Sequence, residues 1–308
     1  MKHKTLIADI LLLLVALVWG ATFVLVKNVI EILPPFSFNA FRFIIAAIFL
    51  LIIILVFYRN VLAQINRKQI LIGGFVGIFL FAGYAFQTIG LLTTTASKAG
   101  FITGMSVVIV PLIAIIFLKE ALRRQAAIGI SLAILGLFLL SISSDWSIAF
   151  GDFLIFLCAI SYALHIIFVG KWAPGYHALG LAFIQITTVA ILNTISAILF
   201  EDLVNLDVQA ILVPTVLWGI FICSIFATAL AFLIQTAAQK FTSPTKTAII
   251  LATEPVFAAI AGYLFANELL AMREWLGCMM ILLGMIIAEW PSPSERKARK
   301  LTKELNAS

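Results

Sequence analysis

The sequence predicts an all-α polytopic membrane protein with ten transmembrane helices in two inverted five-helix repeats. Composition is the first reason. Of the 308 residues, 63% are hydrophobic and 11% are charged, whereas soluble domains carry about 25% charged residues. The second reason is a series of long apolar stretches. The third is a set of polar residues and glycines that recurs at one constant spacing, 148 positions, as Gln87 and Gln235 illustrate.

Ten apolar stretches approach the roughly 20 residues that a helix needs to cross a bilayer. We expect transmembrane helices at residues 7–29, 36–57, 70–92, 98–118, 125–143, 151–170, 179–200, 210–233, 246–266 and 272–290. The strands of an outer-membrane barrel would run about 10 residues and alternate in character, and these stretches do not alternate. The segments between them are short, so we expect no inserted soluble domain.

The recurring residues divide the chain into two halves. They are Gln87, Thr88, Lys98, Glu120, Gly129 and Gly136, which return as Gln235, Thr236, Lys246, Glu268, Gly277 and Gly284. We place the first repeat at 1–144, the second at 145–291 and a basic tail at 292–308. Because five is an odd number, the second repeat enters the membrane from the opposite side, an architecture typical of secondary transporters.

The same relation extends to the first two helices of each repeat at a spacing of 143 positions. The counterparts there are Asp9 with Asp152, Trp19 with Tyr162, and Arg42 with Gln185. Two inverted halves can adopt two near-equal arrangements, one open on each side of the membrane. That geometry is the basis of alternating access.

Basic residues predict the orientation. With the N-terminus inside, the inner face receives sixteen of them: Lys2, Lys4, Arg59, Arg67, Lys68, Lys119, Arg123, Arg124, Lys171, Lys240, Lys246, Arg296, Lys297, Arg299, Lys300 and Lys303. The outer face receives two, Lys98 and Arg273. This bias predicts a multi-pass protein of the cell inner (cytoplasmic) membrane with both termini cytoplasmic. The net charge of +6 therefore reflects orientation, and we expect the lipid bilayer rather than nucleic acid as partner.

Glu254 is the first candidate for function because polar groups within the hydrocarbon are costly. It lies eight residues into its helix, about 12 Å along the axis at 1.5 Å per residue, between Thr253 and Pro255. Pro255 and, in the first repeat, Pro111 each remove an amide donor and so interrupt a helix. We expect a binding site there, with protons as the coupling ion through Glu254. The alternative is an acid that pairs with a basic residue of another helix.

Several further residues are candidates for substrate binding or gating. Lys246 shares a helix face with Glu254, whereas the first repeat carries Lys98 and Ser106 at those positions. Gln87 and Gln235 either line two gates or bond helix to helix. Arg42 can attract an anion.

Trp19, Tyr84 and Tyr162 either stack on a substrate or pack, and we read His165 as a core residue. Gly73 and Gly77 suit close helix contact and are weak evidence for a homodimer. The three cysteines lack disulfide or metal-ligand spacing, and we expect no cofactor or metal.

The chain resembles the drug/metabolite transporter superfamily in its ten-helix form with two EamA-type repeats. The resemblance rests on Trp19-Gly20, Arg42, the run from Phe101 through Pro111 to Glu120, and Thr253-Glu254-Pro255 through to Glu268. It implies a central cavity lined mainly by helices 3, 4, 8 and 9, with helices 1, 2, 6 and 7 contributing and helices 5 and 10 peripheral. Glu120 and Glu268 would be structural.

The resemblance also sets the functional expectation. We expect a secondary transporter of a small polar metabolite, in the first place an amino-acid or metabolite exporter working by alternating access. The alternatives are an uptake carrier or exchanger, or a flippase for a lipid-linked group. No phosphate-binding loop is present in the sequence, and three scattered histidines provide no acid–base or metal constellation, so we do not expect an enzyme.

Overall fold

The computed structural model describes residues 2–94, 96–119, 121–141, 149–202, 208–265 and 270–290. Within these ranges the regular structure is helical and contains no strand. The spans are α1 (Lys2–Ile30), α2 (Pro35–Phe57), α4 (Arg67–Gly90), α5 (Ala96–Gly104) with α6 (Ser106–Ile113) and η1 (Ala114–Leu118), α7 (Arg124–Ser141), α8 (Phe150–Trp172), α9 (Ala178–Phe200), α11 (Pro214–Ser224) with η4 (Ile225–Leu230) and α12 (Ala231–Ala238), α13 (Pro244–Leu251) with α14 (Glu254–Phe265), and α15 (Met272–Glu289).

The predicted fold class is confirmed. Eight spans in the described part are long and apolar enough to cross a membrane, and α7 adds a shorter apolar helix. Three short helices, α3 (Asn60–Gln64), η2 (Ala173–Gly175) and α10 (Val208–Ile211), lie between spans. The basic tail, Glu120 and Glu268 fall outside the described residues, as does the side chain of Lys98.

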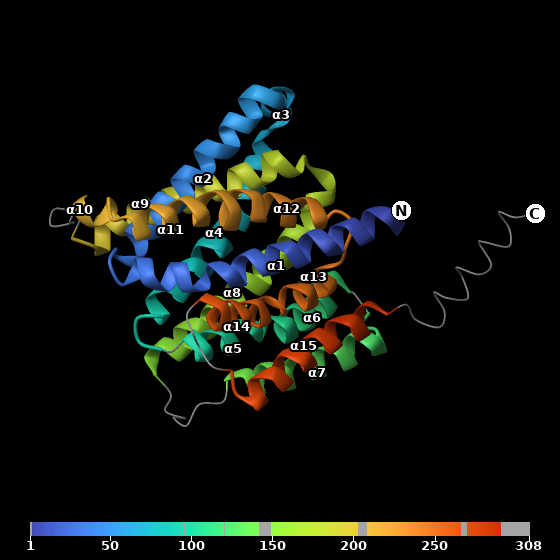
Figure 1. Cartoon of the computed structure of the whole chain (residues 1–308). Helices are drawn as coiled ribbons and strands as arrows, with labels where there is room; N and C mark the ends of the chain where they lie inside the picture. The colour runs from blue at the N-terminus through green and yellow to red at the C-terminus, as the bar shows by residue number, and fades with distance from the viewer. Residues whose placement is uncertain are drawn as a thin grey trace, which may run out of the picture.

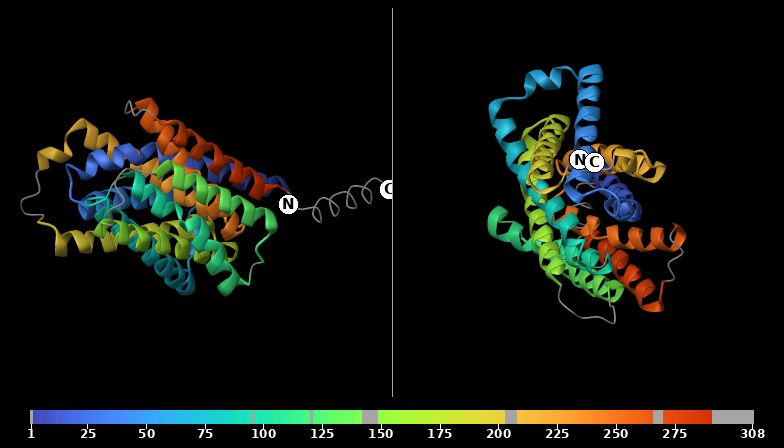
Figure 2. Two further views of the ribbon diagram at one scale, coloured as in Figure 1. Left: turned by 90° about the horizontal axis from the view of Figure 1, so that it is seen from below. Right: turned by 90° about the vertical axis from the view of Figure 1, so that its left-hand side faces the viewer.

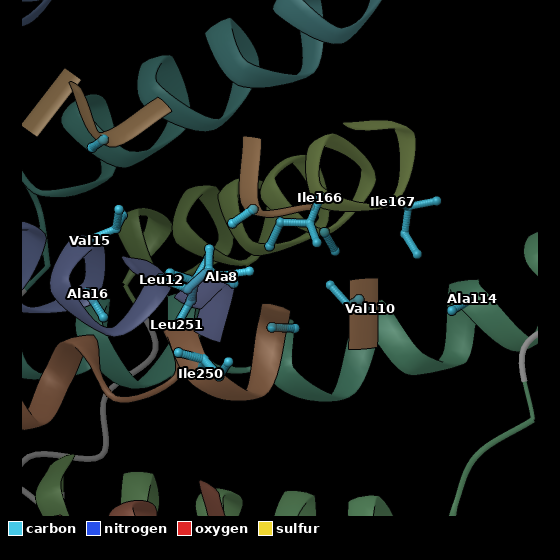
Figure 3. Packing of buried hydrophobic residues seen from close by; sticks show 14 residues of the cluster. Ala8, Leu12, Val15, Ala16, Val110, Ala114, Ile166, Ile167, Ile250 and Leu251 are labelled. Atoms are coloured by element: carbon cyan, nitrogen blue, oxygen red, sulfur yellow. The ribbon is translucent and has the colours of Figure 1, made fainter. Parts of the chain in front are cut away.

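Each half of the chain packs mainly against the other half. In Figure 1, α1 crosses the middle of the molecule, and it contacts α12, α13 and α14 of the second repeat. The helices α2 and α4 pack on α9, and α4 also packs on α8. Figure 3 shows Leu12 of α1 next to Ile250 and Leu251 of α13, in a buried cluster that also holds Ile166 of α8. The core is therefore built between the repeats.

The helices α7 and α15 lie side by side along one edge of the bundle (Figures 1 and 2). Glycines of the two repeats meet there reciprocally, Gly129 with Gly284 and Gly136 with Gly277. A Cβ atom added to Gly136 would lie 2.6 Å from the carbonyl oxygen of Gly277, and one added to Gly277 would lie 2.6 Å from that of Gly136. Only glycine allows this approach, which explains why these glycines recur in both repeats.

Gly73 and Gly77 of α4 pack against α9 of the same chain. A Cβ atom on Gly73 would meet Ile184 of α9 at 2.6 Å, and one on Gly77 would meet Thr188 at 2.7 Å. The glycines let α4 approach α9 closely. This patch therefore gives no support to a homodimer.

Two spans, in which the sequence predicts helix breaks at Pro111 and Pro255, are interrupted about halfway. The fourth is broken at Met105, between α5 and α6, and the ninth at Ala252 and Thr253, between α13 and α14. Met105 and Thr253 are counterparts in the repeat, although the prolines are not. Pro255 directly follows the first residue of α14, whereas Pro111 lies inside α6. Half-helix ends at this depth can contact polar ligands.

Candidate binding cavity

A cavity of about 410 Å³ lies between the two repeats. This volume suits a small molecule. Its wall is rich in aromatic side chains: Trp19, Phe23, Tyr84, Phe101, Tyr162 and Phe232. Its charged lining residues are Lys27, Glu31, Arg42, Glu254 and Glu274. Apolar surface with a few charged groups is the usual composition of a small-molecule site.

The two ends of the cavity differ. At one end the lining includes Glu31, just beyond the last residue of α1, and Glu274 in the first turn of α15; we call this the open end. At the other end, Lys246 Nζ lies 2.6 Å from Asp9 Oδ2, and this ion pair joins α13 to α1. Lys240 Nζ also donates to Tyr176 O there at 3.0 Å. We call this the closed end.

Glu254 begins α14 and faces the cavity. Within the described part of the chain its carboxylate makes no hydrogen bond or ion pair. The interruption before it follows from Pro255, which has no amide hydrogen to give the carbonyl of Leu251. Thr253 is turned away, since its hydroxyl donates to Ile250 O at 2.7 Å and its side chain is buried. The backbone break thus presents a carboxylate to the cavity.

Arg42 is buried, with 4% of its surface exposed, at the wall of the cavity. Its Nε donates to Thr228 Oγ1 at 2.6 Å, and its Nη2 donates to Tyr84 Oη at 3.1 Å and to Ala227 O at 3.3 Å. The guanidinium also stacks over the Tyr84 ring, 4.8 Å from its centroid. These contacts fix a positive charge in the wall that also acts on Glu254.

The π-helical segment η4 explains how Arg42 is held. Thr228 lies in η4 and its hydroxyl reaches back five residues to Cys223 O, at 2.8 Å. The carbonyl oxygen of Ala227, also in η4, accepts from Arg42 and, at 2.8 Å, from Trp19 Nε1. A π-turn leaves carbonyls available for such bonds. The local distortion therefore holds the Arg42 side chain in place at the cavity wall.

Gln87 and Gln235 occupy counterpart positions at the cavity but differ in their hydrogen bonds. Tyr162 Oη donates to Gln87 Oε1 at 3.2 Å. Gln235, the counterpart of Gln87, donates to Gln239 Oε1 at 3.4 Å, while its own Oε1 is buried and has no hydrogen-bond partner. The aromatic contacts are matched: the Tyr84 and Tyr162 centroids are 5.7 Å apart, and those of Trp19 and Phe232 are 5.3 Å apart.

His165 is both a buried residue and a cavity residue. Its Nε2 lies 2.8 Å from Gln185 Oε1, and Gln185 Nε2 donates to Thr236 Oγ1 at 2.9 Å. The prediction of a core histidine therefore describes only part of the surroundings of His165, because the ring also lines the cavity. The sequence analysis did not propose Thr228 or Gln185 for the site. The repeat offered a signal for Gln185, because it is the counterpart of Arg42.

The cavity brings together most of the candidate residues. Its lining includes Trp19, Arg42, Tyr84, Gln87, Ser106, Gln235, Glu254 and Pro255. Pro111 and Thr253 are buried and do not line it, and Lys246 lies at the closed end, where it pairs with Asp9. The side chain of Lys98 lies outside the described part of the structure.

The wall differs from what the resemblance implied. The helix α1 supplies a large share of it, from Trp19 to Asn28, whereas no lining residue comes from α9, the seventh span. The reason is the position of α1 between α12 and α14. The helices α7 and α15 contribute only Leu140 and Glu274.

Comparisons with known proteins agree with this architecture. The EamA-like transporter family matches residues 6–142 and 149–290. A protein of Archaeoglobus fulgidus described as an uncharacterized transporter is 34% identical over 284 residues, which cover 92% of this chain and 86% of that protein. The WAT1-related protein At3g02690, chloroplastic, of Arabidopsis thaliana is 27% identical, with 90% of this chain and 68% of that protein covered.

A known crystal structure has the same fold. It has a TM-score of 0.77 and covers 94% of this chain and 98% of its own, at 18% identity. This likeness concerns the fold alone. The family match extends over nearly the whole chain and includes the cavity-lining helices. The chain belongs to the EamA-like transporter family, as its resemblance to the ten-helix drug/metabolite transporters indicated.

Proposed function

We propose that this protein is a secondary transporter that exports a small polar metabolite, an amino acid, by alternating access. One observation carries the proposal. A cavity of about 410 Å³ between the repeats is lined at one end by Glu31 and Glu274, whereas toward the other end α1 packs against α8 and α13 in a buried apolar cluster next to the Asp9–Lys246 ion pair. A path open on one side at a time is what alternating access requires.

The positive-inside bias supports an orientation for this arrangement. It puts the closed end, with the N-terminus, in the cytoplasm and the open end outside the cell. The arrangement described here would then be the outward-open one. In the opposite state, separation of Asp9 from Lys246 would admit the substrate from the cytoplasm.

The charges in the cavity support an amino acid as substrate. Arg42 presents a guanidinium, which suits a carboxylate, and Glu254 presents a carboxylate, which suits an ammonium group. Both line one cavity. Trp19, Tyr84 and Phe232 offer apolar ring surface for a side chain. Opposite charges in an aromatic cavity match a zwitterion better than they match a phosphate or a simple cation.

We propose further that protons are the coupling ion and that Glu254 binds a proton and the substrate in turn during the cycle. Among the described residues its carboxylate has no hydrogen-bond partner, so a proton or an ammonium group can take that place. The other titratable or charged side chains that line the same cavity are Lys27, Glu31, Arg42, Tyr84, Tyr162, His165 and Glu274. Arg42 is the one that always carries a positive charge.

Transport in proteoliposomes tests the proposal. Vesicles loaded with a pooled mixture of metabolites are followed by mass spectrometry, with and without an imposed pH gradient. We expect amino acids to leave faster with the gradient, and Glu254→Gln to abolish the dependence on it. Efflux of phosphorylated or purely anionic compounds without efflux of amino acids would refute amino acids as the substrate class. Wild-type pH dependence in Glu254→Gln would refute proton exchange at this residue.

A further inference from the structure

The two repeats place equivalent aromatic residues on equivalent neighbours. Tyr162 of α8 rests its ring on Tyr84 of α4, and its counterpart Trp19 of α1 rests its ring on Phe232 of α12. Tyr84 and Phe232 are themselves counterparts in the repeat. These two contacts form one motif that occurs twice, and each copy joins a residue of the first repeat to a residue of the second.

The hydrogen bonds of this motif are not equivalent. Gln87 lies three residues after Tyr84, and its Oε1 accepts from Tyr162. Gln235 lies three residues after Phe232, but its Oε1 has no partner although the residue is 1% exposed. Trp19 donates instead to Ala227 O. Buried acceptors are rarely left without a donor, so the missing bond needs an explanation.

Trp19 lies against the helix that carries the unpaired acceptor. Residues three apart on a helix share one face, so Gln235 follows Phe232 by about one turn on the side where Trp19 already packs. The helices α1 and α12 are in direct contact, and Trp19 and Gln235 both line the cavity. A modest shift of the indole along α12 would exchange one acceptor for the other.

We propose that in the state open at the opposite end, Trp19 Nε1 donates to Gln235 Oε1 while Tyr162 releases Gln87. Inverted repeats exchange conformations between the two states, so each copy of the motif then adopts the bond that the other copy has now. This inference rests on the proposed alternating access and assigns a positioning role to Gln235 and Gln87. Each glutamine stabilises one of the two states.

The two glutamines therefore make matched variants with opposite effects. Gln235→Leu removes an acceptor that is unused here, together with the long 3.4 Å bond to Gln239, so its main effect falls on the opposite state. Gln87→Leu removes the acceptor of Tyr162 and disfavours the present state. Tyr162→Phe removes the same bond through the loss of one oxygen atom. Each change is expected to shift the balance of states by about three- to tenfold, the effect of one hydrogen bond.

Thiol labelling measures that balance without any substrate. Val26 lines the cavity near the open end, and its counterpart at the spacing of 143 is Val169, which is fully buried. Each is replaced by cysteine in a background in which the three native cysteines, all buried, are replaced by alanine. We expect Gln235→Leu to lower labelling of Val169→Cys, and Gln87→Leu and Tyr162→Phe to raise it while labelling of Val26→Cys falls.

A double variant tests whether Gln235 acts through Trp19. In a Trp19→Phe background the indole donor is gone, so Gln235→Leu should shift the labelling no further. Shifts in the same direction for the two glutamine variants, or a full Gln235→Leu effect without the indole, would overturn the inference while alternating access stands. If Val169→Cys never labels in any variant, alternating access itself fails.

Discussion

Gly20 of α1 lies directly against the backbone of Glu254, at the first turn of α14. A Cβ atom at position 20 would lie 2.5 Å from the Glu254 carbonyl oxygen and 2.7 Å from the Ala258 nitrogen. Both neighbours are backbone atoms and cannot rotate away. Gly20 thus sets how closely α1 approaches α14, the helix that carries the Glu254 carboxylate.

Gly20→Ala is therefore expected to be harmful. The added methyl group forces α1 and α14 apart, and we expect a loss of stability of about 1–3 kcal/mol together with slower transport. Thermal unfolding in detergent and efflux from proteoliposomes measure the two effects. Gly175→Ala is the matched control, because nothing lies within 4 Å of a Cβ atom there. Equal melting temperatures for the two variants would contradict this account.

The Asp9–Lys246 pair gives a second prediction. Its side chains are 17% and 18% exposed, respectively, so water screens the pair only in part, and its loss should loosen the closed end. We expect Asp9→Asn to raise hydrogen exchange in α13 and in the first turns of α1. The double reversal Asp9→Lys with Lys246→Asp should restore protection.

Two outcomes would speak against this gate. Unchanged exchange in Asp9→Asn would mean that apolar packing alone keeps the end closed. Failure of the double reversal to recover protection would mean that the two side chains do not act on each other. Lys240→Gln, at the same end but bonded to a carbonyl, serves as the comparison.

The fold could be predicted because its determinants are repetitive. Long apolar stretches fix the helices, and residues such as Gly129 and Gly277 recur because the packing of α7 on α15 demands glycine in both halves. The interruption at Met105 could not be read in the same way. The proline of that span, Pro111, lies six residues farther along and inside α6, so it does not mark the break.

The sequence predicts which residues belong to the candidate site better than it predicts the contacts that these residues make. Glu254 and Arg42 stood out because charge within a span is costly. Lys246 was placed on the face of Glu254 by counting along one helix. That count assumes a continuous helix, which the structure interrupts at Ala252 and Thr253. In the structure Lys246 pairs with Asp9 of α1 instead. Partners from distant helices, such as Thr228, depend on tertiary packing.

Gly136 and Gly277 give a prediction about stability. A methyl group on either one would meet the carbonyl of the other at 2.6 Å, so Gly136→Ala and Gly277→Ala should each cost about 1–3 kcal/mol. The double variant should cost less than the sum, since one methyl group already separates α7 from α15. Gly74→Ala is the control, because its nearest neighbour would be Thr188 Oγ1 at 3.9 Å. Additive losses in thermal unfolding would show that the two sites do not share a contact.

Arg42→Lys tests whether the cavity needs a guanidinium or only a positive charge. The present bonds use Nε toward Thr228 and Nη2 toward Tyr84 and Ala227, and a single ammonium group cannot reproduce that planar arrangement. We expect the lysine side chain to bond within the wall and leave the substrate carboxylate poorly held, with efflux reduced by about tenfold or more. Thr228→Val removes only the hydroxyl that Arg42 Nε contacts, so its loss should be smaller and of the same kind. Wild-type rate and affinity in Arg42→Lys would show that charge alone suffices, and the carboxylate would then have to be bound elsewhere in the cavity.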